Sequence, residues 1–115
     1  MFFKNKNGEA NFKKIAKTSS DPKERMQAVE QISDHDFLFD IATHDNDFGV
    51  SKAATIKITN QSYLTKIGRD NAASDWRVRK AAIGLMTDKV ALQYIIDNER
   101  ELTINYAAQE RMKSL

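Results

Sequence analysis

Apolar residues recur three and four positions apart along most of this chain, in short runs that polar breaks separate. The first clear run covers residues 9–18, where Phe12 and Ile15 share one face and lysines occupy the other, the spacing of an amphipathic helix. A break follows at Asp21 and Pro22. Aspartate is a preferred N-cap and proline a preferred first helical residue, so this break predicts the start of a second helix.

The same pattern then repeats. Residues 28–41 align on residues 54–67 with a shift of 26, and these align on residues 82–95 with a shift of 28. Each copy has alanine, an apolar residue four positions on, a Ser/Thr–Asp/Asn pair, and then leucine and isoleucine three apart. A last shift of 26 reaches Ala108 and Met112. Recurrence at this period predicts a repeat protein made of short helical hairpins.

Each part of the repeat has a physical role. The alanines allow close helix packing, and the Ser/Thr–Asp/Asn pair caps the following helix. The spaced leucine and isoleucine form a buried stripe, which a unit can cover only by stacking on its neighbours. We therefore expect one all-α domain over residues 1–115, a right-handed α-α superhelix (α-solenoid) of three to four hairpin repeats. Its predicted parts are an N-terminal cap helix at about 9–18, repeats at about 21–46, 47–74 and 75–100, and a C-terminal cap helix at about 101–114.

Two local features complete this prediction. The two extra residues before the third copy fall in the loop at residues 69–74, where an insertion costs little. Phe2 and Phe3 are expected to pack beneath the N-terminal cap helix.

Composition limits the chemistry available. The 115 residues include 18 basic and 16 acidic side chains, a net charge of +2, and no cysteine, which removes disulfides, thiolate metal ligands and a cysteine nucleophile. No apolar run approaches the ~20 residues of a membrane span. The lysines and asparagines after Phe3 leave no apolar core for a signal peptide, so a cytoplasmic location is expected. We predict no cofactor and no enzymatic activity.

Residues 75–82, Asp-Trp-Arg-Val-Arg-Lys-Ala-Ala, and more weakly residues 47–54 resemble the D-x-x-V-R-x-A-A helix of bacterial HEAT-like repeats, including the phycobilin-lyase type. The resemblance spans most of the chain. It implies the superhelical architecture but no particular activity, because such repeats serve many roles. The arginine of this signature is present at Arg25 and Arg79 but replaced in the other copies by Ser51 and Asn105. An Asp–Arg ladder is therefore incomplete, and its arginines are expected to pair helix ends.

The resemblance implies that the second helix of each unit lines a concave, partner-facing side. Charge alternates along that side, which suits a protein or peptide better than a phosphate backbone. We therefore predict a non-catalytic scaffold that binds a protein or peptide. Phe39 and Tyr94 are its most distinctive residues, as exposed contacts or, alternatively, as side chains packed between repeats. The candidate partner-binding residues are Lys13, Lys14, Lys17, Phe39, Asp40, Thr43, Thr65, Lys66, Arg69, Gln93, Tyr94 and Asp97.

Other functions remain as alternatives. Nucleic-acid binding would use Lys13, Lys14, Lys17, Lys66 and Arg69. A DNA-glycosylase-like or lyase-like activity is a weaker alternative. A glycosylase would need a carboxylate beside an aromatic pocket, and Asp40 next to Phe39 comes nearest to that arrangement.

Several further residues are interpreted structurally. Trp76 and Phe48 share one slot of the repeat and are expected to wedge between units. His35 and His44 lie among aspartates in turns, where aspartate is needed for capping, so no metal site is predicted. At the C-terminal end, Met112 and Leu115 lack a covering helix, and a homodimer through this end is a further hypothesis.

Overall fold

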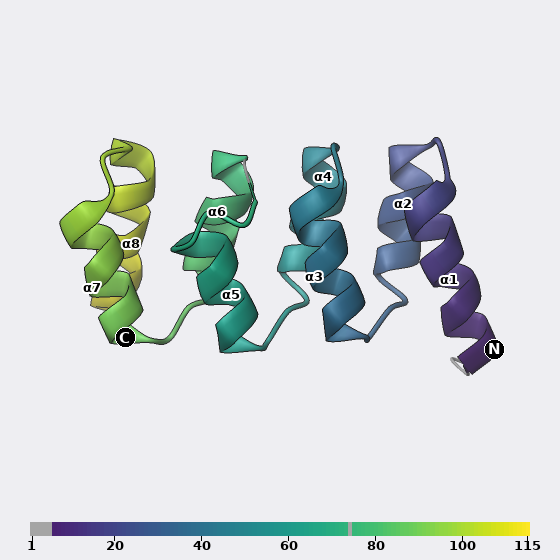
Figure 1. Ribbon diagram of the computed structural model, residues 1–115, viewed down its shortest axis with the longest axis horizontal. Helices are drawn as coiled ribbons and strands as arrows, with labels where there is room; N and C mark the ends of the chain where they lie inside the picture. The colour runs from purple at the N-terminus through teal and green to yellow at the C-terminus, as the bar shows by residue number, and fades with distance from the viewer. Residues whose placement is uncertain (1–5, 74) are drawn as a thin grey trace.

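A computed structural model describes residues 6–73 and 75–115 and places eight helices and no strand in these ranges (Figure 1). The all-α class is therefore confirmed. Phe2, Phe3 and Ser74, the last in the loop with the two extra residues, lie outside the described residues. The helices are α1 (Lys6–Thr18), α2 (Pro22–Val29), α3 (His35–His44), α4 (Phe48–Thr55), α5 (Gln61–Gly68), α6 (Trp76–Ile83), α7 (Lys89–Asn98) and α8 (Leu102–Ser114).

The helix starts follow the predicted capping pairs, with one refinement. The second residue of each pair is the N-cap: Asp34 accepts hydrogen bonds from the N–H groups of Asp36 and Phe37 at 3.0 and 3.2 Å. Its neighbour Ser33 bonds instead to Glu9 of α1, donating from its N–H at 3.2 Å and from its hydroxyl at 3.1 Å. The first residue of this pair therefore connects neighbouring units.

The core consists of the positions that define the repeat. The anchors at the leucine and isoleucine positions and the repeated alanines are at most 3 % exposed. Val50 and Val78 share a further buried position on α4 and α6, and the residue after each repeated alanine, Val29, Thr55 or Ile83, is also buried. The predicted anchors, all buried, are Ala28, Ile32, Leu38, Ile41, Ala54, Ile58, Leu64, Ile67, Ala82, Met86, Leu92, Ile95 and Ala108.

The helices lie in two layers along an elongated molecule of 46 × 24 × 19 Å (Figure 1). We call α2, α4, α6 and α8 the even layer and α1, α3, α5 and α7 the odd layer. Successive even helices pack directly on one another, whereas in the odd layer close backbone packing is mainly between α1 and α3. Side chains therefore make most of the contacts across the remaining odd helices.

The most closely packed helix pairs are α1–α2, α3–α4, α5–α6 and α7–α8. Each pair joins an odd helix to the next even one, so these hairpins are offset by one helix from the units at 21–46, 47–74 and 75–100. Short connections at residues 19–21, 45–47 and 99–101 turn the chain back on itself within a pair. The connection between α5 and α6 is longer, and its Ala73 is buried against the core.

The side chain at one position of each unit donates a hydrogen bond to a carbonyl at the C-terminal end of an odd helix. Arg25 of α2 donates to the carbonyl of Ser19 at 2.8 Å, just after α1. Through Nε and Nη2 the same guanidinium also bonds both oxygens of Asp45, at the end of α3, at 3.0 and 3.1 Å. Ser51 occupies this position in the next unit, and its shorter side chain reaches only the carbonyl of Asp45, at 2.9 Å.

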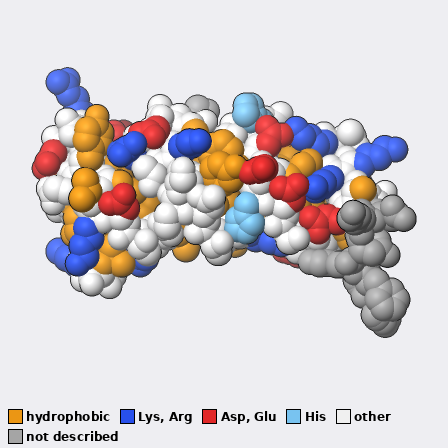
Figure 2. Space-filling view, turned by 60° about the horizontal axis from the view of Figure 1, so that its bottom comes forward, with side chains coloured by type: hydrophobic (Ala, Val, Ile, Leu, Met, Phe, Trp, Pro, Cys, Tyr) orange, Lys and Arg blue, Asp and Glu red, His pale blue; other side chains and the backbone are white. Residues whose placement is uncertain are grey.

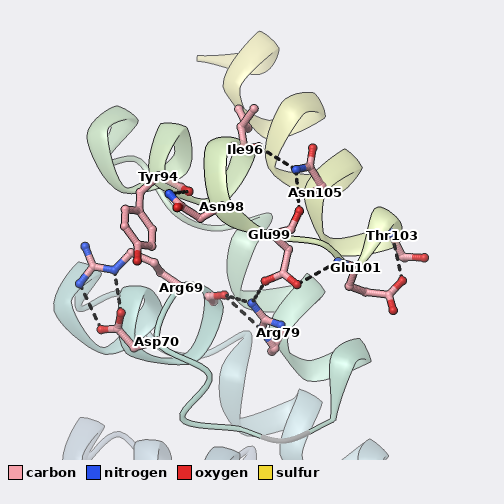
Figure 3. Close-up of polar contacts among 11 residues, drawn as sticks. Arg69, Asp70, Arg79, Tyr94, Ile96, Asn98, Glu99, Glu101, Thr103 and Asn105 are labelled. Carbon is pink, nitrogen blue, oxygen red and sulfur yellow. Dashed lines mark hydrogen bonds and ion pairs between the residues drawn. The ribbon is translucent and has the colours of Figure 1, made fainter.

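The arrangement recurs in the second half of the molecule (Figure 3). Arg79 donates to the carbonyl of Gly68 at 3.0 Å and to Glu99 Oε1 at 2.7 Å, which connects the ends of α5 and α7. Asn105 then donates to the carbonyls of Ile96 and Glu99 at 2.8 and 3.1 Å. The arginines therefore pair helix ends, as their incomplete ladder predicted.

Candidate functional site

The candidate partner-binding residues come from the odd helices and their C-terminal ends, so they lie along one layer. Exposure differs among them: Lys13, Phe39, Asp40, Thr43 and Thr65 are half-buried. The exposed members of the set are Lys14, Lys17, Lys66, Arg69, Gln93, Tyr94 and Asp97.

Carboxylates accompany most of the basic candidates. Lys13 Nζ lies 2.7 Å from Asp34 Oδ2, and this hydrogen bond holds the pKa of Asp34 below its ordinary value. Lys17 forms an ion pair with Asp40. The layer therefore carries paired charge. In Figure 2, acidic and basic side chains are interspersed over the visible face. A phosphate backbone needs a continuous basic track instead.

Phe39 packs between odd helices. Its ring stacks on Tyr63 of α5, with centroids 4.5 Å apart and planes 22° apart, and Lys66 Nζ lies 6.0 Å from the Phe39 centroid. The hydroxyl of Tyr63 donates to Asp36 of α3, and this bond raises the pKa of Tyr63. Phe39 therefore contributes to packing between repeats, the second of its two predicted roles.

Tyr63 was not singled out from the sequence. Its slot in the repeat holds Phe37 one unit earlier, so an aromatic recurs there in two successive copies. That recurrence was the available signal.

Tyr94 has the opposite environment. Its side chain is 55 % exposed on α7, and the guanidinium carbon of Arg69, the C-cap residue of α5, lies 5.6 Å from its ring centroid (Figure 3). Arg69 in turn bonds Asp70 at 2.7 Å, which lowers the pKa of Asp70. Tyr94 borders a surface groove of about 490 Å³, here called the Tyr94 groove. It is lined by Lys89, Val90, Gln93, Tyr94, Asp97, Asn98 and Met112.

Asp40 and Phe39 do not share a pocket. Asp40 pairs with Lys17 and with His44, whose Nδ1 lies 3.0 Å from Asp40 Oδ1. The groove beside Asp40 is lined by polar and aliphatic residues, among them Arg25. Phe39 is not among the residues that line this groove.

His35 and His44 are the first and last residues of α3, so they lie in a helix and not in the turns where they were expected. Among residues 6–73 and 75–115, no three side chains of the His, Asp and Glu types gather as metal ligands. Nδ1 of His35 is buried without a hydrogen-bond partner.

Trp76 and Phe48, the first residues of α6 and α4, differ in burial. Phe48 is half-buried and packs against the core, and the guanidinium carbon of Arg77 in the next unit lies 4.1 Å from its ring centroid. Trp76 does not wedge between units as expected, because it is 49 % exposed, and Leu102 in the same slot is 80 % exposed. Val50 and Val78, two residues after Phe48 and Trp76, fill the core.

Neither the protein-family models nor the curated proteins nor the solved structures gave a match to this chain. Within the part of the chain that the structure describes, no helix combines the length and the apolar character needed to cross a bilayer.

Proposed function

We propose that this chain is a small cytoplasmic HEAT-like solenoid, its helix pairs following a right-handed superhelix. The repeat in the sequence, the two helix layers and the recurring bonds at the helix ends support this architecture. The binding face is assigned to the odd layer because the exposed candidate residues lie there, whichever way the stack curves.

We further propose that the protein is a non-catalytic scaffold whose odd layer binds another protein or a peptide, with the Tyr94 groove at the C-terminal end of this layer as the main contact. The exposure of Tyr94 beside this groove is the observation that carries the proposal. Tyrosine and arginine are the residue types that most often dominate binding energy at interfaces, and here Arg69 lies over the Tyr94 ring.

The groove also combines the two kinds of surface that such a partner needs. Val90 is 80 % exposed and Met112 is half-buried, so the groove offers apolar contact. Gln93 and Asp97, which bond each other at 2.9 Å, and Asn98 supply polar groups at its edge. An apolar centre with a polar rim is the usual composition of an interface.

The test uses a photo-crosslinking phenylalanine analogue in place of Gln93. We expect it to capture a defined partner in cells, and Tyr94→Ala to reduce that capture about tenfold or more, as loss of a hot-spot residue does. Tyr106→Ala is the matched control, because Tyr106 is 62 % exposed on the neighbouring helix α8 and lies outside the groove. Equal capture by both variants would remove the proposal.

Two other experimental outcomes would support a different function for this protein. Capture of a second copy, together with a dimer in light scattering that Leu115→Lys abolishes, would support the homodimer through the C-terminal end. An oligonucleotide whose affinity falls steeply with salt and with Lys14→Glu and Lys66→Glu would support nucleic-acid binding instead.

A further inference from the structure

A second groove lies on the even layer, away from the candidate partner-binding residues. It runs between the neighbouring helices α4 and α6 and has a volume of about 360 Å³. Phe48 and Lys52 line it from α4, one helical turn apart, and Trp76 and Lys80 occupy the equivalent positions on α6. We call it the Trp76 groove, and its complete lining is Phe48, Lys52, Trp76, Arg77, Lys80, Ala81 and Gly84.

One end of the Trp76 groove is aromatic. Trp76 is 49 % exposed, a large apolar surface left in contact with water. Beside it, the guanidinium carbon of Arg77 lies 4.1 Å from the centroid of Phe48, close enough for a cation–π interaction that holds the ring in place. This end can therefore receive an apolar side chain against a fixed aromatic wall.

The charge of the groove has one sign. All three charged residues that line it are cationic, and Arg77 is already paired with Asp75 at 2.8 Å. Lys52 and Lys80 have no ion pair within the described residues, although Lys52 Nζ lies 5.9 Å from the Phe48 centroid. Two uncompensated ammonium groups therefore flank the aromatic end.

We propose that the Trp76 groove is a second binding site, and that it takes an acidic peptide segment carrying a large apolar side chain. The apolar side chain would pack on Trp76 and Phe48, and carboxylates on the following turn would meet Lys52 and Lys80. An anionic membrane or a nucleic acid would share the charge requirement, but a groove bounded by two helices and closed by an aromatic wall fits one chain segment. This site is independent of the proposed odd-layer function.

Trp76 is the only tryptophan of the chain, so its fluorescence reports directly on this groove. The probe is a short peptide with glutamates and phenylalanines at helical spacing. We expect it to shift Trp76 emission and to bind saturably, and we expect the same peptide with lysines for glutamates, or serines for phenylalanines, to bind at least about tenfold more weakly. Lys52→Glu with Lys80→Glu should weaken the acidic peptide about tenfold or more.

The control changes net charge by the same amount elsewhere: Lys14→Glu with Arg100→Glu should leave the affinity within about twofold. Circular dichroism checks that each variant is folded, and Tyr94→Ala should have no effect on this titration. An equal loss in both charge variants, or no response of Trp76 to the peptide, would overturn the proposal. So would a response only to vesicles containing phosphatidylserine or only to a single-stranded oligonucleotide.

Discussion

Arg79 and Glu99 connect the ends of two odd helices: Arg79 Nη2 lies 2.7 Å from Glu99 Oε1, with 11 % and 20 % of the two side chains exposed (Figure 3). The same guanidinium bonds the carbonyl of Gly68. Because both partners are largely shielded from water, this pair differs from the exposed ion pairs of the surface, which contribute little.

Arg79→Ala should therefore destabilise the fold. It removes the hydrogen-bond donor of Glu99 Oε1 and of the Gly68 carbonyl, at a cost of about 2–4 kcal/mol. Arg77→Ala is the control on the same helix, because Arg77 pairs with Asp75 at an exposed site. That change should cost less than about 1 kcal/mol. Urea unfolding would measure both, and equal losses would contradict the role given to Arg79.

The same pair makes stability depend on pH. The hydrogen bond from Arg79 holds the pKa of Glu99 below its ordinary value of 4.5. A lowered pKa in the folded state stabilises the fold above the ordinary value, and this stabilisation is lost as pH falls through the folded value. The difference in unfolding free energy between the wild type and Glu99→Gln should be full above about pH 5 and shrink below about pH 4.5. A difference that stays constant down to pH 3 would contradict this linkage.

His35 offers a stabilising change. It occupies the slot of Glu9 and Gln61, each of which accepts a hydrogen bond from the N–H of the next turn: Gln61 Oε1 accepts from Thr87 at 2.9 Å and Glu9 from Ser33 at 3.2 Å. The buried Nδ1 of His35 has no such partner. His35→Gln should supply the missing acceptor to the turn at Thr59 and raise the unfolding free energy by about 0.5–1.5 kcal/mol.

Thermal unfolding of His35→Gln would show this gain, and a loss of stability would mean that the slot differs in this unit. His35→Ala is the control that separates removal of the ring from the new bond.

Replacing Gly68 or Gly84 by alanine should have different effects on the stability of the fold. A Cβ on Gly68 would lie 2.9 Å from Met86 Sδ and 3.0 Å from Ile83 Cγ1, so Gly68→Ala should cost about 1–3 kcal/mol through overpacking. On Gly84 the nearest atom would be 3.5 Å away, and its φ of −64° suits alanine. Gly84→Ala should be neutral or stabilise by up to about 1 kcal/mol. The midpoints of denaturant unfolding would test the pair.

The core was predictable because burial follows the helical period. Leu38, Leu64 and Leu92 are recognisable as anchors from their spacing alone, and each is fully buried. The capping residue was less certain, since both members of a Ser-Asp pair can accept the N-terminal N–H groups. In the structure, Ser33 bonds to Glu9 of the neighbouring helix, which leaves Asp34 as the N-cap of α3.

The surface residues were harder to assign. Whether Phe39 meets solvent depends on the distance between α3 and α5, which the repeat does not specify. The stack on Tyr63 bridges that distance. The slot of Trp76 is periodic, but a periodic residue can face outward as well as inward. Tyr94 is exposed, the first of its two predicted positions, and its role in binding stays a prediction.

The recurring bonds at the helix ends also divide the molecule mechanically. Arg25 joins the ends of α1 and α3, and Arg79 joins those of α5 and α7, but Ser51 is too short to join α3 to α5. Between those two helices the odd layer relies on the Phe39–Tyr63 stack and on one exposed hydrogen bond from the Tyr63 hydroxyl to Asp36. Under a bending load the molecule would therefore behave as two stiff segments with a compliant joint at its centre.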